Sequence, residues 1–120
     1  MPFAIEFSAE SERDFELIFD HLFESYLGFG ESVEEALDHA MRRILDIRPA
    51  ADRLSAFPIR STAREDILPG VRYVNIDRAI FWFDVDDAAG KVRILAIFFG
   101  GQDHVRHMLV RLLGHASKTD

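Results

Sequence analysis

The residue types able to do chemistry gather in one short stretch near the C-terminus. Asp103, His104 and His107 lie close together there, and histidine is the side chain whose ordinary pKa is nearest to neutral pH. A metal site would need more ligands than these three residues offer. The two histidines are three positions apart, the chain has no cysteine, and protein zinc sites normally use four ligands or three and a water. The pattern therefore predicts neither a metal site nor a cofactor, and favours surface histidines at the start of a helix.

Charge is distributed unevenly along the chain. The 120 residues have a net charge of −7. Residues 1–39 carry eleven acidic residues and one arginine, whereas residues 40–120 carry ten acidic residues and thirteen Lys or Arg. We therefore expect an anionic partner to meet the second part of the chain. The alternative is that the acidic part is only a solvated helix face.

Composition indicates one soluble domain over residues 1–120. Apolar residues make up 48% of the chain and include eleven Phe, which excludes intrinsic disorder. No apolar run reaches the roughly 20 residues that cross a bilayer, and the first residues lack the basic flank and apolar stretch of a signal peptide. Without cysteine there are no disulfides. We expect a cytoplasmic protein with no contact to a membrane.

Hydrophobic spacing in the first part predicts a strand and two helices. Residues 2–7 alternate as a strand does. Apolar residues at 15, 18, 19, 22, 23 and 26 then form one stripe of a helix, with the acidic residues, Asp14 among them, mostly on its other faces. This helix should end near Gly28 and Gly30. A capping box of Ser32 and Glu35 opens a second helix, which is predicted to stop before Pro49.

The second part predicts a sheet and a last helix. Residues 49–70 look irregular, and strand-like segments follow at 71–76, 79–85 and 91–99, joined by turns that make consecutive strands antiparallel. The third segment should present Val92, Ile94, Ala96 and Phe98 on one face and Arg93, Leu95, Ile97 and Phe99 on the other. Trp82 and the Phe residues around it are predicted to lie in the core, although either Trp82 or Phe81 could be exposed.

The last helix is predicted to begin after Asp103, a good N-cap residue, and to end at Gly114, with residues 113–120 forming a flexible tail. The resulting fold class is α+β. It consists of an N-terminal strand, a two-helix hairpin packed on a three- to four-stranded antiparallel sheet, and a C-terminal helix.

Three motifs in residues 68–113 resemble the RelE/ParE toxin superfamily. They are the turn Pro69-Gly70-Val71-Arg72, the aromatic strand and acidic turn of residues 80–87, and the strand of residues 92–99 that leads to the Gly-x-x-Asp motif of residues 100–103. The N-terminal strand and helix pair match in placement. The resemblance thus covers nearly the whole chain, and its specific part covers residues 68–113.

The resemblance implies a growth-inhibiting toxin of a bacterial type II toxin–antitoxin module, of the kind that can stabilise plasmids, neutralised by a cognate antitoxin. Members of the superfamily are either ribosome-dependent mRNA endonucleases, like RelE, or inhibitors of DNA gyrase, like ParE. Fold alone does not decide between an enzyme and a binding protein. A structural or interaction domain without toxicity is the third possibility, and an antitoxin reading frame directly upstream would argue against it.

Site residues follow from the same resemblance. Cleavage of RNA without a metal needs a base, cations for the phosphate and an acid. Arg72 matches the sheet arginine of the nucleases and is expected to clamp a phosphate, unless it pairs with a nearby acid. Gln102 stands where the nucleases have an arginine, and His107 or Met108 where they have a tyrosine. The residues predicted to act in catalysis are Arg72, His107, Arg64 and Gln102.

Departures from the nuclease pattern favour the ParE-like branch. Gln102 is uncharged and Met108 has no acid–base chemistry, so the match to the nuclease site is weaker. The acidic net charge also counts against a ribosomal RNA partner. Antitoxin or target contacts are predicted at the closing helix and the loop before the hairpin: Asp103, His104, Arg106, Met108 and Arg60. Exposed Leu27, Phe29 and Leu113 would suit a helix-in-groove dock for the antitoxin.

Overall fold

The computed structural model describes residues 2–56, 60–100 and 103–118, with side chains as far as residue 114. The elements are, in order, β1 (Ala4–Phe7), α1 (Ala9–Gly28), α2 (Val33–Ala50), the 3-10 helix η1 (Ala51–Ala56), β2 (Thr62–Ala63), β3 (Arg72–Ile76), β4 (Ala79–Asp86), β5 (Lys91–Phe99) and α3 (His104–Lys118). None of the helices described here is long and apolar enough to span a membrane.

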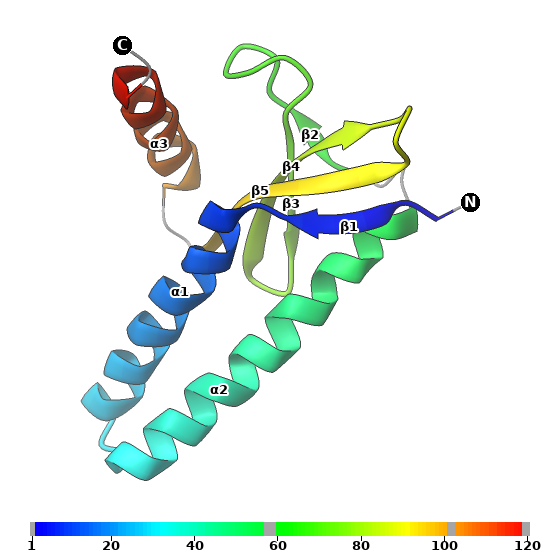
Figure 1. Cartoon of the computed structure of the whole chain (residues 1–120). Helices are drawn as coiled ribbons and strands as arrows, with labels where there is room; N and C mark the ends of the chain where they lie inside the picture. Colours follow the sequence, from blue (N-terminus) through cyan, green and yellow to red (C-terminus); the bar gives the residue numbers. More distant parts are fainter. Residues whose placement is uncertain (1, 57–59, 101–102, 119–120) are drawn as a thin grey trace.

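One five-stranded sheet organises the molecule, in the order β1-β5-β4-β3-β2 (Figure 1). The antiparallel meander of β3, β4 and β5 confirms the prediction for these strands. Asp77 and Arg78 both have positive φ, 52° and 73°, which is the type I′ geometry of a two-residue hairpin. Two features of the sheet were not predicted from the sequence. β1 joins the edge in parallel with β5, and the short β2 forms inside the stretch that looked irregular.

The sheet separates two apolar cores. The first, the hairpin-side core, lies between the sheet and the antiparallel pair α1 and α2; its fully or largely buried members are Phe15, Ile18, Leu22, Ala40, Ile47, Ala50, Ala51, Leu54, Ile76, Ala79, Phe81, Phe83, Val92, Ile94 and Ile97. The second, the α3-side core, lies between the opposite face and α3; its buried members are Val71, Ile80, Trp82, Ala96 and Met108. The prediction that Trp82 and Phe81 are core is confirmed, and neither is exposed.

Both helices of the hairpin begin at a serine cap. Ser8 caps α1 by accepting a hydrogen bond from the Ser11 N–H, and Ser32 and Glu35 form the predicted capping box of α2. Each box residue satisfies an amide that has no partner inside the helix. The cap at Ser8 fixes where α1 follows β1, and the capping box fixes the start of α2 after the hairpin turn.

Two predicted helix ends are wrong. α2 continues through Pro49 to Ala50, because an exposed proline in the last turn removes only one hydrogen bond, and the carbonyl that loses it can bind water. α3 continues through Gly114 to Lys118. A glycine inside a helix costs only about 1 kcal/mol relative to alanine, so Gly114 does not end the helix unaided.

The predicted faces of β5 are wrong after Ile94. The pairing with β4 slips by one residue between Trp82 and Phe83, so that Trp82 lies opposite Ala96 and Phe83 opposite Ile94. Leu95 is therefore the extra residue of a β-bulge. As a result Ile97 joins Val92 and Ile94 in the hairpin-side core, while Ala96 faces α3.

Candidate functional site

Arg72 lies on the hairpin face of the sheet. Side chains alternate along a strand, and Arg72 shares its face with Val74 and Ile76, which pack in the hairpin-side core. Its guanidinium is engaged locally: Nε donates to Ser61 Oγ at 2.6 Å and Nη2 to the Ser61 carbonyl at 3.2 Å. The predicted pairing with an acid is not among these contacts. The sheet thus separates Arg72 from the residues of α3.

Arg64 lies on the opposite face, towards α3. Its backbone N–H donates to the Val71 carbonyl at 3.0 Å, next to the α3-side core. Its guanidinium donates two hydrogen bonds to the Asp66 carboxylate, at 2.9 and 2.8 Å. This pairing raises the pKa of Arg64 and lowers the pKa of Asp66. Arg60, predicted as an antitoxin or target contact, is exposed.

An aromatic cluster anchors the start of α3. Trp82 Nε1 donates to His104 Nδ1 at 3.2 Å, and the Tyr73 ring packs against both rings, with centroids 4.9 Å from Trp82 and 4.7 Å from His104. Burial lowers the pKa of His104, the charge of Arg64 lowers it further, and Asp103 opposes both effects. Because an indole N–H only donates, Nδ1 must accept, and the neutral ring carries its proton on Nε2.

The other predicted residues of α3 divide between core and surface. Met108 is buried in the α3-side core, so it is not accessible to a partner in this conformation. Asp103 acts as the N-cap that the sequence predicted, with Oδ1 accepting from the Arg106 N–H at 3.2 Å. The exposed His107 stacks on Phe98 with ring centroids 5.7 Å apart. Gln102 lies outside the described residues.

The structure therefore disperses the residues predicted for catalysis. Arg72 is on one face of the sheet, Arg64 is paired on the other, and His107 on α3 stacks on Phe98. Among the described residues of the predicted site, Arg64 and Asp103 lie near His104, which packs against Tyr73. Within the described residues, no three His, Cys, Asp or Glu side chains are placed to bind a metal ion.

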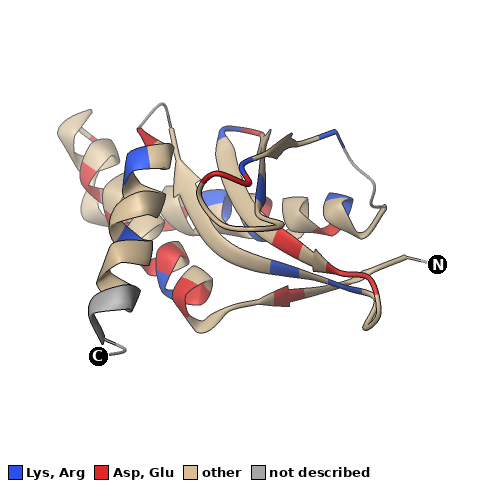
Figure 2. Ribbon diagram, turned by 90° about the horizontal axis from the view of Figure 1, so that it is seen from above, with Lys and Arg blue, Asp and Glu red and all other residues tan. Residues whose placement is uncertain are grey.

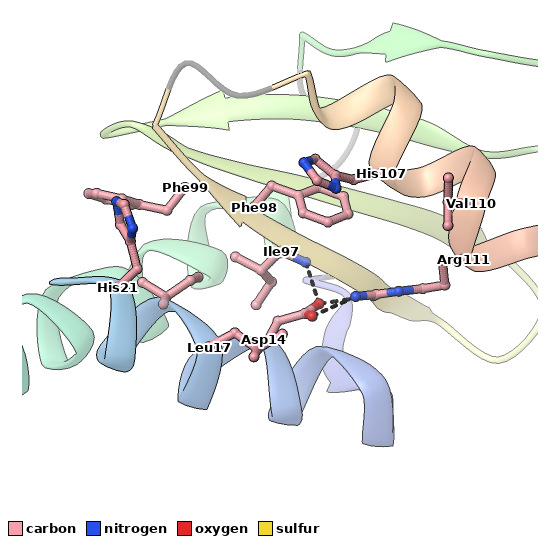
Figure 3. Close-up of a pocket in the computed structure, with 10 residues that line it drawn as sticks. Asp14, Leu17, His21, Ile97, Phe98, Phe99, His107, Val110 and Arg111 are labelled. Atoms are coloured by element: carbon pink, nitrogen blue, oxygen red, sulfur yellow. Dashed lines mark hydrogen bonds and ion pairs between the residues drawn. The ribbon is translucent and has the colours of Figure 1, made fainter. Parts of the chain in front are cut away.

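A second site lies in a groove of about 380 Å³ between α1, β5 and α3 (Figure 3). At its floor the carboxylate of Asp14, only 3% exposed, meets three donors. Oδ1 accepts from Arg111 Nη2 at 2.6 Å, and Oδ2 accepts from Arg111 Nη1 at 3.0 Å and from the Ile97 N–H at 2.9 Å. The Asp14 side chain on α1 thus contacts both β5, through Ile97, and α3, through Arg111.

Arg111 makes contacts beyond those with Asp14. Its Nη1 also donates to the Leu95 carbonyl at 3.3 Å, its guanidinium lies over the Phe98 ring at 5.4 Å, and its Nε is 3.5 Å from Glu10. The hydrogen bonds to Asp14 raise the pKa of Arg111 against the effect of burial. The carbonyl of the bulged Leu95 is therefore satisfied from α3.

Sequence reasoning missed this ion pair and placed Asp14 on the solvent faces of the first helix. A signal was present: Asp14 precedes Ile18 by four positions and Leu22 by eight, which is the spacing of the buried stripe. Nothing comparable marked Arg111, which is 97 positions away from its partner.

Several large apolar side chains are exposed on the described helices. Phe29 at the tip of the hairpin is 85% exposed and Leu113 is 67% exposed, whereas Leu27 is half-buried. Others follow one line along α2: Val33, Leu37, Met41 and Leu45. Contiguous apolar surface on a soluble domain is characteristic of protein interfaces.

Two solved structures have the same fold. A chain of the "Chromosomal ParDE TA system from P. aeruginosa" superposes with a TM-score of 0.59 and 19% identity, covering 82% of this chain and 96% of that one. A chain of the toxin-antitoxin complex RelBE2 from Mycobacterium tuberculosis superposes with a TM-score of 0.60 and 16% identity, covering 85% and 95%. No protein-family model and no curated protein matches the sequence. The RelE/ParE-like fold is thereby confirmed, and the two structures match about equally well.

Proposed function

We propose that this protein is the growth-inhibiting toxin of a type II toxin–antitoxin module and that a cognate antitoxin neutralises it. Support comes from the fold, which chains of two toxin–antitoxin complexes share over more than four-fifths of this sequence. The exposed apolar residues on α2 and α3 agree with a protein that is covered by a partner. The antitoxin would be the product of the adjoining reading frame.

We further propose that the toxin acts by binding its target, with DNA gyrase as the candidate, rather than by cutting mRNA. One observation carries this choice. The groups that a nuclease would need together are separated by the sheet, Arg72 on one face and His107 on α3, and Met108 and Trp82 fill the space between sheet and helix. Acid–base catalysis requires its groups within hydrogen-bonding reach of one substrate.

A ribosome-dependent endonuclease is the alternative, and one arrangement favours it. Arg64, Tyr73 and His104 lie together on the α3 side of the sheet. They offer a cation, a phenol and an imidazole, which are groups that phosphate chemistry uses. In the described conformation, however, His104 Nδ1 is occupied by Trp82. This function would require α3 to move.

Expression of the chain with and without the adjoining reading frame tests the assignment. The chain alone should stop growth, and co-expression should restore it. Substitution then separates the two mechanisms. If the toxin is a nuclease of the alternative kind, Arg64→Ala and His104→Ala should each reduce toxicity and also abolish mRNA cleavage at the ribosome. If the toxin binds gyrase, purified protein should inhibit supercoiling of plasmid DNA without cleaving RNA.

A further inference from the structure

We propose that Trp82 and His104 form a pH-sensitive latch, which holds the start of α3 on the sheet at neutral pH and releases it when His104 gains a proton. The latch is a contact within this chain, so it goes beyond the proposed function and depends on neither target. It bears on the alternative function in one respect, because a movement of the start of α3 has to break this contact.

The latch is a single hydrogen bond inside an aromatic cluster. Trp82 is 0% exposed, and its indole N–H donates to His104 Nδ1 at 3.2 Å. The centroid of the His104 ring lies 5.6 Å from that of Trp82 and 4.7 Å from that of Tyr73. Trp82 belongs to β4, the central strand of the sheet, and His104 is the first residue of α3. The bond therefore joins the beginning of the helix to the middle of the sheet.

A proton on His104 is incompatible with this hydrogen bond. Nδ1 accepts the indole N–H with its lone pair, and a protonated imidazole has no lone pair left, because both of its nitrogens donate. An indole N–H only donates, so Trp82 would lose its acceptor while it remained buried, which is unfavourable. His104 can therefore take up a proton only after the start of α3 has moved away from Trp82.

The charges around His104 act on its protonation in both directions. A helix N-terminus carries a partial positive charge, and Figure 2 shows an acidic residue directly before α3 but only basic and uncharged residues along the described part of the helix. Burial lowers the pKa of His104, the Asp103 carboxylate raises it, and the Arg64 guanidinium, which is paired with Asp66, lowers it. The net direction is downwards, so the closed position favours the neutral ring.

The release should be confined to the first turn of α3. Further along the helix, Met108 is buried in the α3-side core and Arg111 is bound to Asp14. Neither contact involves the first turn, so we expect the later turns to stay in place when the first one opens. Opening uncovers Trp82 and Tyr73, which lie on the face of the sheet opposite the helical hairpin.

Proton linkage gives the size of the effect. A histidine released into solvent has a pKa of about 6.5, whereas the closed latch excludes the proton from Nδ1. A fall in pH from about 7.5 to about 5.5 therefore multiplies the ratio of open to closed latch by roughly ten. The closed form is fully favoured above the open-state pKa, and it loses stability as the pH falls towards the lowered pKa of His104 in the closed form.

Hydrogen exchange of the Trp82 indole N–H, followed by NMR, tests the latch directly, because Trp82 is the only tryptophan. Its exchange rate, divided by that of an unstructured tryptophan peptide at the same pH, should rise about tenfold between about pH 7.5 and 5.5. His104→Gln keeps an acceptor for the indole but does not titrate, so its ratio should change less than about twofold. His107→Gln is the matched control: His107 is exposed on the same helix and stacks on Phe98, so this variant should respond as the wild type does.

Equal pH responses of the wild type and His104→Gln would overturn the proposal, and so would a response that His107→Gln abolishes. The backbone amides of β4 distinguish local opening from unfolding of the whole domain. Their exchange rates, corrected in the same way, should stay constant over this pH range. A rise that matches the rise of the indole would show global unfolding and would also refute the latch.

A second pair of variants keeps the test decisive if His104→Gln does not fold. Asp103→Asn keeps a good N-cap residue but removes the charge that favours the protonated ring, so the rise in exchange should begin at a lower pH than in the wild type. Arg64→Gln removes the charge that opposes the proton, so the rise should begin at a higher pH. Shifts in the same direction, or no shift in either variant, would contradict the assignment of the titrating group to His104.

Discussion

Replacement of Asp14 should be among the most damaging single substitutions on α1. Asp14→Ala removes the charge that balances Arg111 and leaves the Ile97 N–H without an acceptor. Breaking a buried ion pair costs about 3–5 kcal/mol. Because Arg111 keeps 20% exposure and a second contact with Glu10, we expect the lower end, a loss of about 3 kcal/mol. For a domain of this length that lowers Tm by roughly 12 °C.

Urea denaturation followed by the fluorescence of Trp82, the only tryptophan, measures this loss at the junction of sheet and α3. Asp14→Asn is the matched control, since its amide oxygen still accepts from Ile97, and it should lose less than Asp14→Ala. The double variant Asp14→Leu/Arg111→Met removes both charges and should be at least about 1 kcal/mol more stable than the sum of the single changes predicts. A loss below about 1 kcal/mol for Asp14→Ala, or additive effects in the double variant, would refute the reasoning.

Three further predictions concern the anchors of the helices. Burial lowers the pKa of His104 below its ordinary value of 6.5, so the folded state favours the neutral ring; its contribution is complete above pH 6.5 and is lost as the pH falls through the lowered folded value. The urea midpoint of the wild type should therefore drop more between pH 7.5 and about 5 than that of His104→Gln, and equal drops would argue against it. Ser32→Ala should cost about 1 kcal/mol by removing the cap of α2, measured by the same unfolding curves with Ser61→Ala as a comparison outside the helices. Trp82→Phe keeps an aromatic, though smaller, side chain but removes the donor to His104, and faster amide exchange in the first turn of α3 than in the wild type is expected.

Elements with strong local signals could be predicted, and those set by distant contacts could not. The capping box at Ser32, the turn at Asp77–Arg78 and the strands around it depend on neighbouring residues, and each is found as expected. The parallel pairing of β1 with β5 joins segments more than eighty residues apart. No local pattern in the sequence encodes such a pairing.

The bulge at Leu95 shows why the faces of β5 were misassigned. Residues 94–99 are all apolar, so a one-residue slip leaves the hydrophobic pattern unchanged. What fixes the slip is tertiary: Arg111 binds the Leu95 carbonyl and Asp14 binds the Ile97 N–H. These contacts come from α1 and α3, near the two ends of the chain. The spacing of residues within β5 therefore does not predict them.

The candidate site was only partly accessible to sequence reasoning for a related reason. The alternation of β3 shows that Arg72 shares a face with Val74 and Ile76, but it does not show which face the hairpin covers. Met108 was predicted as an antitoxin or target contact, but it is buried in the α3-side core.

Separate pulse-labelling of DNA and protein synthesis, during the first minutes after induction of the chain without its antitoxin, tests the central claim most directly. The account predicts that growth stops and that DNA synthesis falls first while translation continues. An early loss of translation with DNA synthesis intact would contradict the binding mechanism and favour the nuclease. Normal growth with both syntheses intact would contradict the toxin assignment altogether.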